Sequence, residues 1–231
     1  MKKGFFFFTI YCLLSTVSAH AQSVDLLWEG KGYVPPFYQG GAPWTSEGAI
    51  RFVAVPQGFG APASLTYKWS RNGTVLGETN GVGVRTLEIQ DSIFSRPQTV
   101  SVEIMSDEDI LASAAVTVTP RAPSLLIYER HPLFGFLFNK EASRGYSLDE
   151  SEASFTVFPL FYTIPGRDFP YVKYTWRSRG GEDSTSDSVT YRVPEGATGA
   201  ASVSVKVHNT ERIRQTMETN FLVQFNNASN Q

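Results

Sequence analysis

A seven-residue phrase occurs twice in this chain, about one hundred residues apart. Residues 67–73 read Tyr-Lys-Trp-Ser-Arg-Asn-Gly, and residues 174–180 read Tyr-Thr-Trp-Arg-Ser-Arg-Gly. Each phrase is followed some thirty residues later by an alternating valine segment, at 99–104 and at 201–208. A repeat of this length, built from short alternating segments, predicts two copies of one antiparallel β-sandwich.

The two copies can be aligned along most of their length with small drifts in spacing. Four matches define the alignment: Leu26-Leu27 with Leu125-Leu126, 52–56 with 155–159, Tyr67 and Trp69 with Tyr174 and Trp176, and Val100, Val102 and Ile104 with Val203, Val205 and Val207. Insertions in the loops between fixed strands produce such drifts. The sequence thus predicts equivalent strands in the two halves.

The tyrosines and tryptophans of the repeated phrase are the predicted centres of the two cores. Tyr67 and Trp69 alternate with polar Lys68 and Ser70, and Tyr174 and Trp176 alternate with polar residues in the same way. Alternation with period two places the large rings on one buried face of a strand.

Turn residues and prolines divide the chain. Asn72-Gly73 suits a two-residue hairpin, and 107–109 and 209–211 are further turns before the last strand of each copy. The segment 120–123 contains two prolines and is a short, stiff connector. We expect a signal peptide at 1–21, a first domain at 22–120 and a second domain at 121–231.

The N-terminal segment has the pattern of an export signal. Lys2 and Lys3 precede an apolar stretch from 5 to 17, and Ala19-His20-Ala21 supplies small residues for cleavage before Gln22. Retention of this stretch as a membrane anchor is the alternative. The sequence predicts an exported protein located at the cell surface, in a periplasm or outside the cell.

The motif Tyr67-x-Trp69-x-x-Asn72-Gly73-x-x-Leu76, followed by 99–104 and a final hairpin ending at Val118, resembles bacterial PKD-like and immunoglobulin-like domains. The resemblance covers the whole chain after the signal. It implies an all-β protein of two tandem Greek-key sandwiches, with the tryptophan strand in the middle of one sheet and the last two strands as a hairpin. The architecture supports many roles and implies no single function.

Composition argues against several kinds of chemistry. The only cysteine, Cys12, lies in the expected signal, which excludes thiol catalysis and cysteine-ligated metals after cleavage. Without Lys2 and Lys3, 18 basic residues face 22 acidic ones, a net charge of −4 with no basic stripe for nucleic acid. His131 and His208 have no recognisable catalytic partner. We expect no enzyme activity, no catalytic residues and no cofactor.

Three acidic turns are the best candidates for a metal site in the sequence. They lie at 107–109, at 149–152 and at 182–187, and calcium could use their oxygens. Their spacing matches no defined calcium loop, so solvated turns are the favoured interpretation and no metal is predicted.

An aromatic segment before the first core strand is the best candidate for a working surface. Its rings are interleaved with prolines and could stack on sugars or anchor a protein; they are Trp28, Tyr33, Phe37, Tyr38 and Trp44. The alternative, which we favour, is that the segment folds back and seals the open end of the sandwich. The sequence predicts a structural or adhesion module whose partner is an envelope protein, a surface protein or a glycan. A carbohydrate-binding protein is the alternative function.

Overall fold

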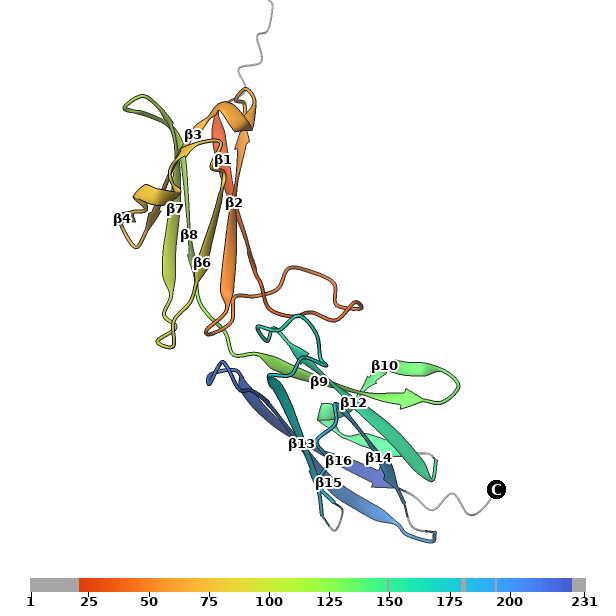
Figure 1. The fold of residues 1–231 in the computed structure, drawn as a ribbon. Helices are drawn as coiled ribbons and strands as arrows, with labels where there is room; N and C mark the ends of the chain where they lie inside the picture. Colours follow the sequence, from red (N-terminus) through yellow and green to blue (C-terminus); the bar gives the residue numbers. More distant parts are fainter. Residues whose placement is uncertain (1–20, 149, 180–181, 194, 226–231) are drawn as a thin grey trace, which may run out of the picture.

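A computed structural model describes residues 21–148, 150–179, 182–193 and 195–225. It contains two bodies made almost wholly of β-strands, one above the other (Figure 1). Apart from Ala21, the expected signal peptide lies outside the described residues. No helix in these ranges is both long and apolar enough to span a membrane.

The first body is a sandwich of two antiparallel sheets. One sheet has the order β1-β2-β6, and the other has the order β4-β3-β7-β8 with β5 paired to β3. The strands are β1 (Ser23–Gly30), β2 (Ala49–Gln57), β3 (Thr66–Arg71), β4 (Thr74–Val75), β5 (Gly81–Val82), β6 (Thr86–Gln90), β7 (Gln98–Ser106) and β8 (Asp109–Val118), with 3-10 turns at Pro62–Ser64 and Gly77–Thr79. The chain crosses between sheets after β2, β5 and β6, which gives the Greek-key order.

The second body repeats the main strands of this plan, with two strands added and with no described strand in place of β4 and β5. Its sheets have the orders β10-β9-β12-β14 and β11-β16-β15-β13. The strands are β9 (Ser124–His131), β10 (Gly135–Glu141), β11 (Tyr146–Leu148), β12 (Glu152–Leu160), β13 (Val172–Ser178), β14 (Ser188–Arg192), β15 (Gly199–Asn209) and β16 (Thr216–Phe225), with a 3-10 turn at Ala142–Arg144. Strand β10 adds a hairpin to one sheet, and β11 runs parallel to β16 at the edge of the other.

The strand register reproduces the repeat. Trp69 lies opposite Val102 in the first body, and Trp176 lies opposite Val205 in the second, as their alignment requires. Each indole also donates a hydrogen bond to a backbone carbonyl, Trp69 Nε1 to Val84 O at 2.8 Å and Trp176 Nε1 to Ser186 O at 2.9 Å. The two rings therefore hold equivalent places in equivalent sheets.

The opening strands are the exception to the predicted alignment. Leu26 lies opposite Ala54, and the residue opposite the equivalent Val157 is Ile127 rather than Leu125. The match in the sequence is thus shifted by two residues. The run 125–128 is apolar without interruption, so its own pattern does not mark which residues face inward.

Each body has its own apolar core. The first core gathers around Tyr67 and Trp69, and the second around Tyr174 and Trp176; all four side chains are buried. The chain has two tandem antiparallel Ig-like sandwiches, and their cores share no residue.

The predicted turns have the backbone that their residues favour. Asn72 and Gly73 both have positive φ, at 50° and 80°, between β3 and β4. Asp107 has a φ of 50° in the two-residue turn between β7 and β8. Paired positive φ values match the right-handed twist of the flanking strands.

Candidate functional site at the domain junction

Residues 31–48, between β1 and β2, leave the first sandwich and reach the second (Figure 1). The Tyr33 amide donates to the Tyr162 carbonyl at 2.6 Å, and the Phe161 amide donates to the Tyr33 carbonyl at 2.7 Å. This reciprocal pair makes a single rung of β-type bonding between the domains. Gly32 permits it, because a Cβ there would lie 2.5 Å from the Phe161 carbonyl oxygen.

Phe37 carries this segment into an aromatic cluster of the second domain. Its ring centroid lies 4.5 Å from that of Phe138, 5.0 Å from that of Phe158 and 5.7 Å from that of Tyr128. The contacts with Phe158 and Tyr128 are edge to face, and such contacts stabilise beyond the area that they bury. Phe37 therefore anchors the first domain to the sheet β10-β9-β12.

A group of buried polar side chains also connects the two domains. The fully buried Gln215 amide donates to the Ser46 carbonyl at 2.9 Å and to Thr163 Oγ1 at 2.7 Å. Its oxygen accepts from the Thr163 amide at 2.8 Å and from Asn209 Nδ2 at 3.0 Å. Every polar atom of Gln215 is thus satisfied, and one of its four bonds crosses the junction.

Glu47 adds a further hydrogen bond across the same junction. Its carboxylate accepts from the Arg214 amide at 2.8 Å, although the two residues are 167 positions apart. The Glu47 backbone has a φ of 60°, and its amide is held by Asp91 at 3.1 Å and Ser95 at 3.2 Å. Hydrogen bonds to a charged acceptor are among the stronger ones in proteins.

The connector between the domains is held by the same segment. The Arg121 amide donates to the Trp44 carbonyl at 2.8 Å, and the Ser46 amide donates to the Arg121 carbonyl at 3.1 Å. Two backbone bonds therefore fix a linker that its prolines already stiffen.

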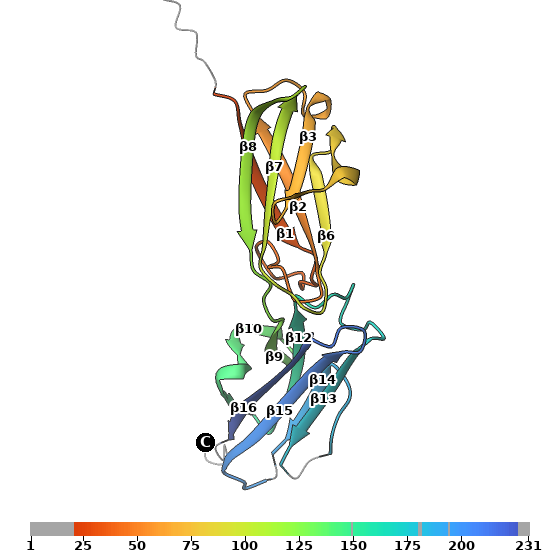
Figure 2. The same cartoon turned by 90° about the vertical axis from the view of Figure 1, so that its left-hand side faces the viewer.

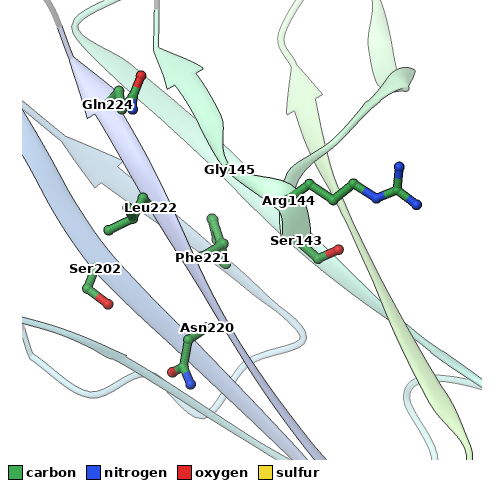
Figure 3. Close-up of a pocket in the computed structure, with 8 residues that line it drawn as sticks. All are labelled: Ser143, Arg144, Gly145, Ser202, Asn220, Phe221, Leu222 and Gln224. Atoms are coloured by element: carbon green, nitrogen blue, oxygen red, sulfur yellow. The ribbon is translucent and has the colours of Figure 1, made fainter.

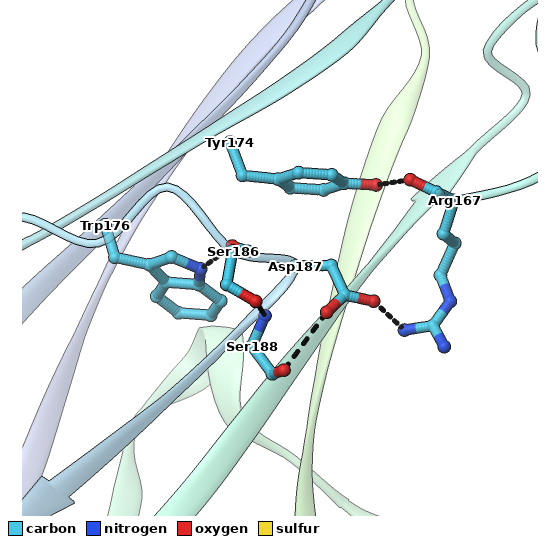
Figure 4. A network of polar contacts seen from close by, with 6 residues as sticks. All are labelled: Arg167, Tyr174, Trp176, Ser186, Asp187 and Ser188. Carbon is cyan, nitrogen blue, oxygen red and sulfur yellow. Dashed lines mark hydrogen bonds and ion pairs between the residues drawn. The ribbon is translucent and has the colours of Figure 1, made fainter. Parts of the chain in front are cut away.

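Arg167 connects the junction to the second core (Figure 4). Its guanidinium pairs with Asp187 at 2.9 Å and lies 4.4 Å from the centroid of the Phe158 ring. Its carbonyl accepts the Tyr174 hydroxyl at 2.7 Å. Burial raises the pKa of the Tyr33 hydroxyl, and the charge of Arg167 partly opposes this shift.

The five aromatic residues predicted as a ligand surface lie in different environments. Trp44 is 1% exposed and donates from Nε1 to the Gly48 carbonyl at 3.1 Å. Tyr33, Phe37 and Tyr38 are partly buried against the second domain, and Tyr38 packs on Phe161. Trp28 on β1 is 41% exposed. The segment therefore joins the domains. Of the five aromatic residues, Trp28 is the most exposed.

An open groove of about 670 Å³ lies between the domains beside this segment. Its ring-bearing walls are Trp28, Tyr38 and Phe161, and Arg121 and Thr117 supply polar atoms. Flat rings next to a cation and a hydroxyl are the groups that a sugar-binding groove uses. Among the described residues, this groove is the place where the sequence prediction of a glycan surface can be tested.

A smaller hollow of about 300 Å³ lies on the second domain, outside β16 (Figure 3). Ser143, Ser202, Asn220 and Gln224 supply hydroxyl and amide groups, and Arg144 is the one ionisable side chain in the lining. The lining offers no pair of titratable groups for acid–base chemistry.

His131 and His208 each form hydrogen bonds with nearby residues. His131 Nδ1 accepts from the amides of Leu133 and Phe134, and its Nε2 lies 3.3 Å from Glu150 Oε1. This arrangement orders the β9–β10 turn. His208 Nδ1 lies 2.8 Å from Thr216 Oγ1 between paired strands. The second contact places a hydroxyl at hydrogen-bond distance from an imidazole, but among the described contacts no third group orients the His208 ring, as a catalytic base requires.

The acidic turns do not converge in the described ranges, where no three His, Cys, Asp or Glu side chains form a metal-binding group. Asp183 pairs with Arg177, Asp187 with Arg167, and Glu152 with Arg192. Three of these carboxylates therefore neutralise neighbouring arginines. Asp149 lies outside the described residues.

Glu47 and Gln215, which close the junction, were not singled out in the sequence. Each lies in a polar loop, where Glu and Gln are ordinary solvated residues. Their burial depends on the approach of the two domains, which local pattern does not encode.

Comparisons with known proteins find similar solved structures but no matching family. No family model matches the chain, and neither does any curated protein. The chicken interferon gamma receptor alpha chain is similar over 75% of this chain and 91% of its own length, at 10% identity and a TM-score of 0.30. A β-glycosidase from Bacteroides vulgatus is similar over 88% of this chain but only 25% of its own, at 11% identity and a TM-score of 0.26.

The tandem Ig repeats of Dlar are also similar, over 89% of this chain and 99% of theirs, at 9% identity and a TM-score of 0.27. Similarities this low carry no functional information. The strand order and register described above make the chain a tandem pair of antiparallel immunoglobulin-like β-sandwiches.

Proposed function

We propose that this protein is an exported, non-enzymatic structural or adhesion module of the PKD-like type. It holds two Ig-like domains at a fixed spacing on a cell surface or in a bacterial envelope, where it contacts a protein or a glycan. The N-terminal pattern of Lys2, Lys3 and an apolar stretch supports export.

The observation that carries this proposal is the closed junction. Domains joined by flexible linkers move relative to one another by default, unless the interface between them is large or specific. Here the Tyr33 rung, the Phe37 cluster and the buried Gln215 bonds all connect the two bodies. A two-domain unit of set geometry suits a spacer or a presenting module better than a flexible tether.

Export and surface exposure can be tested on intact cells. A tag placed after Phe225 should be reached by antibody or added protease without lysis, and the purified chain should begin at Gln22 or retain the N-terminal anchor. A cytosolic protein at the same expression level serves as the control. Recovery of the chain only inside intact cells would reject the proposal.

Carbohydrate binding at the junction groove is a second proposal, supported by the exposed Trp28 face beside Tyr38 and Arg121. A glycan that stacks on Trp28 should change the tryptophan fluorescence. A broad glycan panel that leaves the fluorescence unchanged would reject this second role.

A further inference from the structure

The hairpin formed by β9 and β10 ends in an exposed apolar tip. In Figure 1 this hairpin stands out to the right of the second body, and Figure 2 shows β10 at the outer edge of its sheet. The tip residues Leu133 and Phe134 are 83% and 74% exposed, and neither belongs to the apolar core of the domain. The first domain has no equivalent of β10 among its described strands, so the shared sandwich plan does not account for this tip.

Local hydrogen bonds fix the backbone of the tip while its two apolar side chains stay outside. The loop of residues 132–134 is closed by Gly135, whose φ of 71° is typical of the residue that ends such a short hairpin loop. His131 Nδ1 accepts from the Leu133 amide at 3.1 Å and from the Phe134 amide at 3.3 Å. The Phe134 ring stacks on the imidazole, with the centroids 4.7 Å apart. The tip is therefore ordered before any partner binds, which lowers the entropy lost on contact.

An open polar hollow of about 520 Å³ lies beside the tip. Arg130 at the end of β9 lines it together with hydroxyl groups from β12 and β14, namely Ser154, Thr156, Ser188 and Thr190. The described lining contains no acidic side chain, and within the described chain no ion pair holds the exposed Arg130 guanidinium. A guanidinium next to several hydroxyl groups suits the oxygens of a phosphate group.

We propose that the β9–β10 tip inserts into the interface of a phospholipid bilayer, with Leu133 and Phe134 among the acyl chains and Arg130 at the lipid phosphates. Apolar side chains gain free energy when they leave water for the acyl boundary, and flanking cations are attracted to anionic headgroups. The geometry fits this order of depth. Leu133 and Phe134 lie at the end of the hairpin, and Arg130 lies opposite Phe136, one residue pair behind the closing pair of His131 and Gly135.

The shape and the charge of the hairpin favour a bilayer over a protein partner. A stable protein interface takes about 800 Å² from each partner around a buried centre, and two side chains on a projecting loop provide far less. The segment 130–139 contains no acidic residue, so no carboxylate of the tip would meet the lipid phosphates. The carboxylates of Glu129 and Glu150 line a separate hollow. The contact needs only the folded chain and would hold whether or not the protein acts as a spacer.

Flotation with unilamellar vesicles of phosphatidylcholine and phosphatidylglycerol in equal parts tests this proposal. Both bodies lie after residue 21, so the chain from Gln22 onward is used and the N-terminal apolar stretch cannot bind the vesicles. The double variant L133S/F134S should lower the affinity about tenfold or more. The control is I93S/F94S, which removes another exposed pair, at 41% and 72% exposure, and should leave the affinity unchanged. R130Q should lower the affinity about fivefold at low salt. Thermal unfolding checks that each variant folds.

A fluorescent label at the tip gives a separate readout, because the chain from Gln22 onward contains no cysteine of its own. An environment-sensitive dye on L133C should shift its emission to the blue with vesicles, and the same dye on I93C should not. Inorganic phosphate at the concentration of the lipid phosphate should shift neither. The proposal is overturned if the protein does not float, which is also the result that a protein ligand would give. It is equally overturned if L133S/F134S or R130Q keeps full affinity, if the control pair loses as much, or if phosphate alone shifts the emission.

Discussion

The side-chain amide of Gln215 donates a hydrogen bond to the backbone carbonyl of Ser46, 169 positions earlier in the chain. This bond joins two domains whose cores share no residue. Because Gln215 is fully buried and makes three further bonds, its position depends on both domains at once. Specific side-chain contacts, and not only a short linker, therefore determine how the two domains are joined.

Removal of the Gln215 side chain should weaken the junction. Q215A leaves the Ser46 carbonyl and the Thr163 amide without their partner, at a cost of about 1–3 kcal/mol in the free energy of unfolding. Denaturant unfolding of the full protein measures this loss. N220A is the control, since Asn220 is exposed on β16 and should change the stability by less than about 0.5 kcal/mol. Equal effects of the two variants would contradict the account.

Trp69 and Trp176 should each stabilise one domain. Truncation of a fully buried tryptophan costs about 3–5 kcal/mol, and each indole also loses a hydrogen bond. We expect W69A to unfold the first domain and W176A the second, while the other domain keeps its native amide spectrum. Two-dimensional NMR distinguishes the domains. A variant with unchanged thermal stability would show that its tryptophan does not support a core.

Gly32 should be required for the rung between Tyr33 and Phe161. In G32A the new Cβ would lie 2.5 Å from the Phe161 carbonyl oxygen, so the segment must move away from the second domain. Small-angle X-ray scattering should show a larger radius of gyration or a wider range of shapes. G41A is a matched control in the same segment, because a Cβ there meets nothing within 4 Å. If G32A scatters as the unmodified protein does, the rung does not hold the domains.

Trp28 and Trp44 should respond differently to truncation. In the glycan proposal, W28A removes the fluorescence response and preserves stability, and L27A on the opposite face of β1 leaves the response intact. W44A should instead destabilise the first domain, because Trp44 is buried and bonded to Gly48. A response that survives W28A would place any glycan elsewhere.

Much of the fold could be predicted from local pattern. The alternation around Trp69 and Trp176 and the Asn72-Gly73 turn each describe a structure that neighbouring residues determine. The uninterrupted apolar run at 125–128 did not fix its register, since both faces of that strand look alike in the sequence. The all-β fold of tandem Ig-like sandwiches could be predicted because it depends on such alternating strands and turns.

The candidate site could be predicted less well than the fold, and the reason is physical. The rings at 28–44 are amphipathic or apolar, and the sequence does not say whether a ligand or the second domain covers them. The buried roles of Glu47 and Gln215 arise only when the domains meet.

Distance measurements between spin labels on the two domains test the central claim most directly. Labels at the exposed positions Thr74 and Lys206, in protein diluted with unlabelled chains, report the spread of domain orientations within one molecule. The closed junction predicts one narrow distance distribution, which Q215A and G32A broaden. A broad distribution in the unmodified protein would show that the domains move freely and would contradict the fixed two-domain unit.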